Sequence, residues 1–138
     1  MKTSRKTDYA LHALIILGRN KGQELSVKEI AEIENVSASY LAKVMQELSN
    51  NKIVISVEGK KGGYRLNKKA DEINLADIMM IFEADDNIFE CIDKVHGCTI
   101  KDRCKIHAAF ADAYQKMLDH LKKTTIKDIL NPEVKLSN

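Results

Sequence analysis

Residues 37–50 read SASYLAKVMQELSN, and residues 53–66 read IVISVEGKKGGYRL. In the first stretch apolar residues recur at helical spacing after Ser37, which is a good N-cap residue. This pattern predicts an amphipathic helix. Its apolar positions are Leu41, Val44, Met45 and Leu48. The second stretch is rich in β-branched residues and is divided by a glycine-rich turn, which predicts a two-stranded hairpin.

Upstream of this helix the sequence predicts two more helices. Ser26 and Glu29 form a capping-box pattern ahead of a short helix that ends near Glu34. Its expected apolar face is Val27, Ile30 and Ile33. An earlier helix carries Leu11, Leu14, Ile15 and Gly18 at helical spacing, and residues 20–22 would end it. Two helices joined by a tight turn and followed by a hairpin have the order of a winged helix-turn-helix.

Downstream, the chain is again helical. Asn74 and Asp77 can cap a fourth helix, and Thr125 with Asp128 can cap a last short turn. Between them, a long amphipathic helix carries Ile106, Phe110, Ala113, Met117 and Leu121. We therefore predict a mainly α (α+β) protein with a winged helix-turn-helix over residues 1–83. A cysteine-bearing segment follows over residues 84–105, and the long helix with a C-terminal tail occupies residues 106–138.

The two halves of the chain differ in charge. Residues 1–70 hold 13 Lys and Arg against seven Asp and Glu, a net charge of +6, whereas residues 71–138 hold nine against 13, a net charge of −4. Such scatter can arise by chance on a protein surface. A basic half that also has the helix-turn-helix order nevertheless favours double-stranded DNA as the partner.

The expected DNA contacts lie on the predicted recognition helix and on the hairpin. An α-helix fits the major groove, while glycines and basic residues in a hairpin tip allow close approach to phosphates or to the minor groove. The candidate residues are Ser37, Ser39, Tyr40, Lys43 and Gln46 on the helix, and Lys60, Lys61, Gly62, Gly63, Tyr64 and Arg65 in the hairpin.

All three cysteines lie in one polar stretch without helical or strand periodicity, as Cys91-x6-Cys98-x5-Cys104-x2-His107. Thiolates with an imidazole suit an iron–sulfur cluster, zinc or Cu(I), although structural zinc sites usually contain closer cysteine pairs. Direct oxidation of the thiols is a further alternative. The spacing leaves these possibilities open and favours a cluster only mildly over zinc.

Four motifs together resemble the Rrf-two family of bacterial winged-helix regulators, in particular its iron–sulfur type, which includes IscR-like and NsrR-like members. They are residues 7–11 (TDYAL), residues 36–41 (VSASYL), residues 62–66 (GGYRL) and the cysteine triplet. The resemblance covers about residues 1–130. It implies a homodimer built on the long helix, which binds a palindromic operator.

The resemblance also implies ligands. Cys91, Cys98 and Cys104 match the cysteines that hold the iron of the cluster. His107 matches the fourth ligand of a 2Fe-2S cluster in IscR-like members, and Asp8 matches the fourth ligand of a 4Fe-4S cluster in some NsrR-like members. The spacing between Cys91 and Cys98 is one residue longer than in the IscR pattern. Members without the triplet are less similar.

Several function classes are not expected. No Ser-His-Asp order, pair of catalytic carboxylates or phosphate loop suggests an enzyme. We expect neither a secretion signal nor a membrane span, and therefore a cytoplasmic protein with reduced thiols. The resulting hypothesis is a DNA-binding regulator, most simply a repressor. Its operator affinity would follow an iron–sulfur cluster that senses nitric oxide, redox state or iron–sulfur status. The alternative is the same regulator with cluster-free thiol oxidation.

Overall fold

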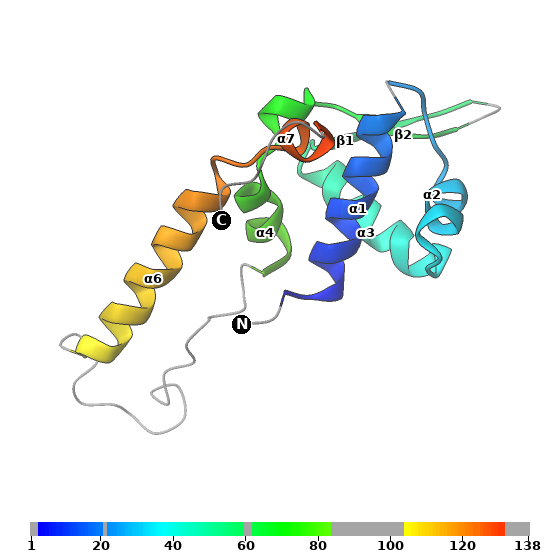
Figure 1. The fold of residues 1–138 in the computed structure, drawn as a ribbon. Helices are drawn as coiled ribbons and strands as arrows, with labels where there is room; N and C mark the ends of the chain where they lie inside the picture. The colour runs from blue at the N-terminus through cyan, green and yellow to red at the C-terminus, as the bar shows by residue number, and fades with distance from the viewer. Residues whose placement is uncertain (1–2, 21, 60–61, 84–103, 132–138) are drawn as a thin grey trace.

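The computed structural model describes residues 3–20, 22–59, 62–83 and 104–131. In the described part a central helix is surrounded by shorter helices and a hairpin, and one long helix extends away from this body (Figure 1). The elements are α1 (Arg5–Arg19), α2 (Val27–Glu34), α3 (Ala38–Asn50), β1 (Val54–Val57), β2 (Gly63–Leu66), η1 (Ala70–Glu72), α4 (Leu75–Glu83), α6 (Lys105–Leu121) and α7 (Ile126–Leu130). This confirms the mainly α, winged-helix fold. Within these residues, no helix combines the length and the apolar character that crossing a membrane requires.

Side-chain caps set where the helices begin. The Ser26 Oγ accepts from the Glu29 backbone N–H at 3.1 Å, and the Glu29 carboxylate accepts from the Ser26 N–H at 2.7 Å. Ser37 caps α3 by accepting from the Tyr40 N–H at 3.4 Å. These contacts satisfy N–H groups that have no partner inside a helix. The caps predicted from the sequence are thereby confirmed.

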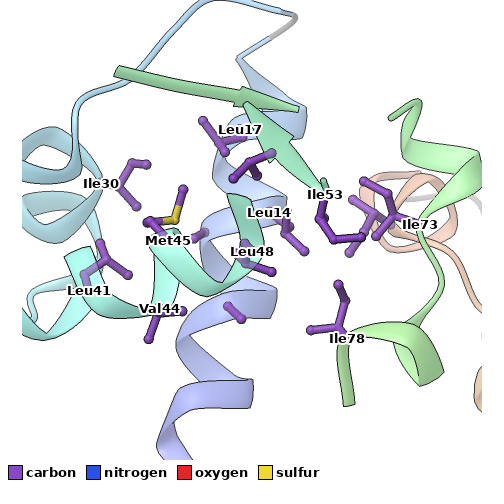
Figure 2. Close-up of a cluster of buried hydrophobic side chains, with 14 of the residues drawn as sticks. Leu14, Leu17, Ile30, Leu41, Val44, Met45, Leu48, Ile53, Ile73 and Ile78 are labelled. Carbon is purple, nitrogen blue, oxygen red and sulfur yellow. The ribbon is translucent and has the colours of Figure 1, made fainter. Parts of the chain in front are cut away.

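The core lies between α1, α2, α3 and the start of β1, and it is aliphatic (Figure 2). The four predicted apolar positions of α3 are fully buried. Two expectations need correction. The fully buried face of α1 is Ala10, Ala13, Leu14 and Leu17 rather than the face through Leu11 and Ile15. Ile33, expected on the apolar face of α2, is 62% exposed. The residues that this eight-residue helix buries are Ile30 and Ala31.

The hairpin is antiparallel and is attached to the loop before α2. Val54 pairs with Leu66 and Val57 with Gly63. Leu25 adds a bridge to Tyr64, with backbone N···O distances of 3.0 and 2.8 Å. A Cβ on Gly63 would lie 2.5 Å from the Leu25 carbonyl oxygen, so glycine is required there by the chain's own packing.

In this turn the described residue with positive φ is Gly59, at 149°. Gly63 is paired with Val57 in the antiparallel ladder, where regular backbone is extended with negative φ.

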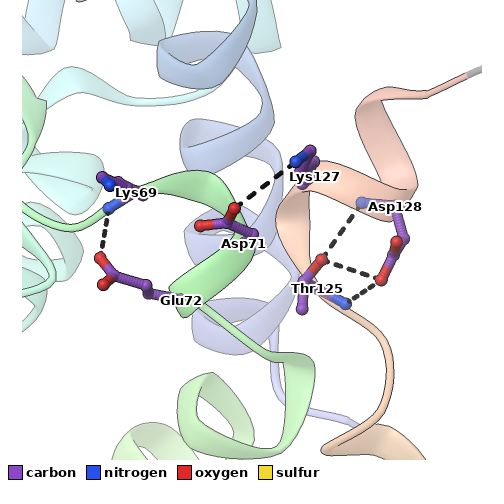
Figure 3. Close-up of polar contacts among 6 residues, drawn as sticks. All are labelled: Lys69, Asp71, Glu72, Thr125, Lys127 and Asp128. Atoms are coloured by element: carbon purple, nitrogen blue, oxygen red, sulfur yellow. Dashed lines mark hydrogen bonds and ion pairs between the residues drawn. The ribbon is translucent and has the colours of Figure 1, made fainter.

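The C-terminal helix α7 packs back against the core formed by α1, α2 and α3. Ile126 is fully buried in the same core as Leu14, and its N–H donates to the Ile73 carbonyl at 2.9 Å. Thr125 and Asp128 form the predicted capping box, and Lys127 contacts Asp71 of η1 at 3.5 Å (Figure 3). Hydrogen bonds from the Thr125 backbone and hydroxyl lower the pKa of Asp128.

Helix α6 contacts the body through its C-terminal half. Leu118 packs with Ala76 and Met79 of α4 in a small second cluster, which Tyr114, Met117 and Leu121 flank. Toward its N-terminus, Ile106 is 61% exposed and Phe110 is 46% exposed. The predicted apolar stripe therefore exists, but much of it faces solvent in a single chain.

Candidate functional site

The first turn of α3 borders a hollow of about 420 Å³. Four predicted DNA-contact residues line it, together with two residues of α1. The complete lining is Ser37, Ser39, Tyr40 and Lys43 with Arg5 and Tyr9. The structure therefore brings the N-terminal part of the predicted recognition helix and the first turns of α1 to one surface.

Arg5 and Tyr9 were missed by the sequence analysis. Their signal was weak, because a basic or aromatic residue in the first turns of a helix is common on protein surfaces. The Tyr9 and Tyr40 rings meet edge to face with their centroids 5.4 Å apart. This contact joins α1 to α3, and only the tertiary structure reveals it.

The other predicted DNA-contact residues lie outside this hollow. Gln46 is exposed farther along α3, where its amide donates to Asn50 Oδ1 at 3.1 Å. Arg65 is exposed on β2 opposite Ile55, while Tyr64 is half-buried. The Gly62 N–H donates to the Gly59 carbonyl at 2.9 Å. Lys60 and Lys61 lie outside the described residues.

A buried carboxylate ties α4 to the start of α1. Glu83, the last residue of α4, is 5% exposed, and it accepts hydrogen bonds from the Ser4 N–H at 2.7 Å and from the Thr7 hydroxyl. Ser4 is also the N-cap of α1. The end of α4, which directly precedes residues 84–103, is therefore held against the turn of α1 that carries Arg5 and Asp8.

Asp8 lies beside a second carboxylate with an unusual environment. Neither carboxylate oxygen of Glu34 has a hydrogen-bond partner among the described residues, although both are buried. Burial, and secondarily the negative charge of Asp8, raise the pKa of Glu34 to about 7. Asp8 itself is exposed and contacts His12 Nε2 at 3.7 Å.

Two of the predicted cluster ligands lie at the start of α6. Cys104 is its half-buried N-cap residue with a free thiol, and His107 is exposed in the first turn. Cys91 and Cys98 lie outside the described residues. The described residues contain no group of three or more possible metal ligands.

Comparison with protein families gives a match over residues 3–132 to the Rrf2 model, described as an iron-dependent transcriptional regulator. The chain belongs to the Rrf2 family. This is the Rrf-two family that the motifs resemble, and the match spans nearly the whole chain. The protein is therefore a DNA-binding transcriptional regulator and not an enzyme.

Individual relatives agree with the Rrf2 assignment. The chain is 35% identical over 138 residues to the HTH-type transcriptional regulator NsrR of Oceanobacillus iheyensis, covering 99% of this chain and 94% of the relative. It is similar to the structure of CymR, the global cysteine regulator of B. subtilis, with a TM-score of 0.71 and 30% identity, covering 94% and 96% of the two chains. The T. potens IscR structure shares the fold, with a TM-score of 0.72 at 23% identity, covering 99% and 94%.

Proposed function

We propose that this Rrf2 regulator is a homodimeric repressor that binds a palindromic operator, and that an iron–sulfur cluster sets its operator affinity. The cluster would be held by Cys91, Cys98 and Cys104, with His107 or Asp8 as the fourth ligand. The signal would be nitric oxide, redox state or iron–sulfur status. The observation that carries the sensing part is the position of Cys104 and His107 at the start of α6.

The DNA-binding part is supported by the surface around α3. The first turn of α3 is exposed at Ser37 and Ser39, and Lys43 stands one turn farther along the helix. The hairpin projects from the same body beside α2 (Figure 1). A recognition helix with an adjacent basic wing can occupy a major groove and the neighbouring backbone or minor groove.

The dimer is supported by the exposed stripe on α6. A helix that leaves Ile106 and Phe110 this exposed gains free energy by burying them against a second copy. Two copies related by a two-fold axis would place two recognition helices on the two half-sites of a palindrome.

The donor chemistry fits a cluster. Cys104 supplies a thiol at a helix N-terminus, and His107 supplies an imidazole one turn later. Figure 1 shows the start of α6 far from α1 within one chain. A cluster that used Asp8 together with Cys104 would thus be completed by the α1 of the second subunit. When bound, a cluster would supply a centre that reacts with nitric oxide or oxidants.

Anaerobic purification tests the proposal. We expect visible absorbance with iron and sulfide bound to the wild-type protein, and their loss in Cys98→Ala with an unchanged far-ultraviolet circular dichroism spectrum. His107→Ala and Asp8→Ala then assign the fourth ligand, since only one of them should alter the absorption spectrum and iron retention. Protein that stays colourless and iron-free after reconstitution would contradict a cluster.

Mobility shifts test the coupling between cluster and operator. Coupling energies between sites are typically about 1–3 kcal/mol, so operator affinity should differ roughly 5- to 150-fold between cluster-loaded and cluster-free protein. The Cys98→Ala variant should behave like the cluster-free form under both conditions. Equal affinities of the loaded and cluster-free forms would exclude the cluster as the sensor.

Thiol oxidation is the second candidate, and the free, half-buried Cys104 thiol favours it. It predicts an oxidant-induced disulfide on non-reducing gels and a change in operator affinity without iron. If oxidation still changes the operator affinity of metal-free protein, thiol oxidation is the mechanism. Its absence in metal-free protein would favour the cluster.

A further inference from the structure

We propose that Arg5 of α1 anchors a backbone phosphate of the DNA beside the recognition helix. This inference rests on the proposed DNA-binding function. It assigns a contact to α1, which lies outside the helix-turn-helix pair and the wing. The geometry that points to it is the hollow between the first turns of α1 and α3, where Arg5 faces Lys43 and the hydroxyls of Ser37 and Ser39.

The charged residues that line the hollow are all basic. Two of its six lining residues, Arg5 and Lys43, are basic and none is acidic. Within the described residues, no carboxylate forms an ion pair with either of them. Two cations from different helices that converge without a counter-charge attract an anion, and hydroxyl and phenol groups beside them can donate hydrogen bonds to its oxygens.

The walls of the hollow are held in place by internal contacts. The edge-to-face packing of Tyr9 on Tyr40 sets the separation of α1 from α3. The Ser37 and Ser39 hydroxyl oxygens lie 2.9 Å apart, and Ser37 also caps the helix. A site that is assembled before the ligand arrives loses less conformational entropy on binding.

Neighbouring basic residues on α1 have different roles. Lys6 pairs with Glu47, farther along α3, at an Nζ···Oε1 distance of 3.5 Å. The Lys6 charge is thereby partly neutralised within the chain, whereas Arg5 lines the hollow. A guanidinium can donate two parallel hydrogen bonds to one phosphate, which a lysine ammonium cannot reproduce.

A DNA phosphate is the occupant that this position favours. With α3 in the major groove, the groove edge that passes the N-terminus of α3 carries the sugar–phosphate backbone. Arg5 lines the hollow beside that end of α3. A phosphate contact of this kind fixes the position of the helix and carries no base specificity.

Arg5→Ala, Arg5→Lys and the matched control Lys6→Ala test this anchor. Each protein is titrated by fluorescence anisotropy against a duplex selected by the wild type from a random pool, and against a scrambled duplex, over a range of salt. For Arg5→Ala we expect about a tenfold loss at low salt on both duplexes. The slope of log K against log salt should fall by roughly 0.9 for each subunit. Arg5→Lys should keep the slope and recover only part of the affinity, and Lys6→Ala should alter the slope much less.

Three results would overturn the inference. The first is an Arg5→Ala slope equal to that of Lys6→Ala. The second is a loss confined to the selected duplex, which would indicate base reading. The third is thermal stabilisation of the wild type, but not of Arg5→Ala, by inorganic phosphate while the DNA slopes stay equal, which would indicate a free-anion site. If the wild type binds neither duplex, the proposed function itself fails. If the wild-type affinity for DNA falls steeply with salt and only the effect of Arg5→Ala is absent, the Arg5 contact is wrong and the proposed function stands.

Discussion

The winged-helix body and helix α6 differ in how their apolar side chains are buried. In the body, residues from α1, α2, α3, β1, α4 and α7 form one aliphatic core within a single chain (Figure 2). On α6 the small cluster around Leu118 packs on α4, whereas Ile106 and Phe110, nearer to Cys104, are exposed. The core of the body is therefore complete within one chain, whereas the apolar stripe of α6 is not covered by described residues of the same chain to the same extent. This contrast is what the proposed dimer through α6 would explain.

The largest effect should come from the body core. Ile30 and Ile33 lie on the same helix, but Ile30 is fully buried and Ile33 is exposed. Ile30→Ala should lower the free energy of unfolding by about 2–5 kcal/mol, since it removes buried methyl groups and leaves a cavity. Ile33→Ala is the matched control and should cost less than about 0.5 kcal/mol in urea unfolding. Equal losses of unfolding free energy in the two variants would show that Ile30 is not buried in the core as described.

The next effect should appear in dimerisation. Phe110→Asp places a charge in the exposed stripe and should weaken the dimer by about a hundredfold, or roughly 3 kcal/mol, because the charge would have to be desolvated. The control is Ala108→Asp, on the opposite side of α6. Sedimentation equilibrium measures both variants. If Phe110→Asp stays as dimeric as Ala108→Asp, then α6 is not the dimer helix.

A smaller effect is expected where α4 meets α1. Glu83→Ala leaves the Thr7 hydroxyl and the Ser4 N–H without their buried acceptor, which should cost about 1–3 kcal/mol of unfolding free energy. Glu72 also accepts a backbone N–H, from Lys69 at 2.9 Å, but it is exposed. Glu72→Ala should therefore cost much less in the same urea titration. A similar loss in both variants would remove Glu83 as a link between the two regions.

The smallest effect concerns pH. The pKa of Glu34 in the fold is about 7, above its ordinary value of 4.5, so the folded state binds a proton more tightly than the unfolded state. Its contribution to stability is therefore complete below pH 4.5 and is lost as the pH rises toward 7. Since Glu34 is only partly buried, we expect on the order of 1 kcal/mol.

Glu34→Gln in cluster-free protein should reduce this pH dependence, seen as a higher melting temperature than wild type at alkaline pH and little difference at acidic pH. Glu32→Gln, on the exposed face of the same helix, is the control. An unchanged pH profile in Glu34→Gln would show that Glu34 titrates normally.

Much of the local structure could be predicted because its causes are local. The Ser26–Glu29 and Thr125–Asp128 capping boxes and the buried face of α3 depend on residues within about one turn of each other, and all were confirmed. The exposure of Ile33 could not be predicted, because it depends on what α2 packs against. The approach of Arg5 and Tyr9 to α3 could likewise not be predicted from the sequence, since it joins residues more than thirty positions apart.

By itself, the sequence of this protein determined its main helices, its hairpin, its family and the thiol-rich segment. Caps, periodicity and motifs depend on residues that are close together in the sequence. Tertiary structure alone decided that α7 returns to the first core, that Glu83 reaches Thr7 and that α1 shares a basic hollow with α3. The physical reason is that packing free energy depends on which surfaces meet, and a one-dimensional pattern shows that a face is apolar without showing what covers it.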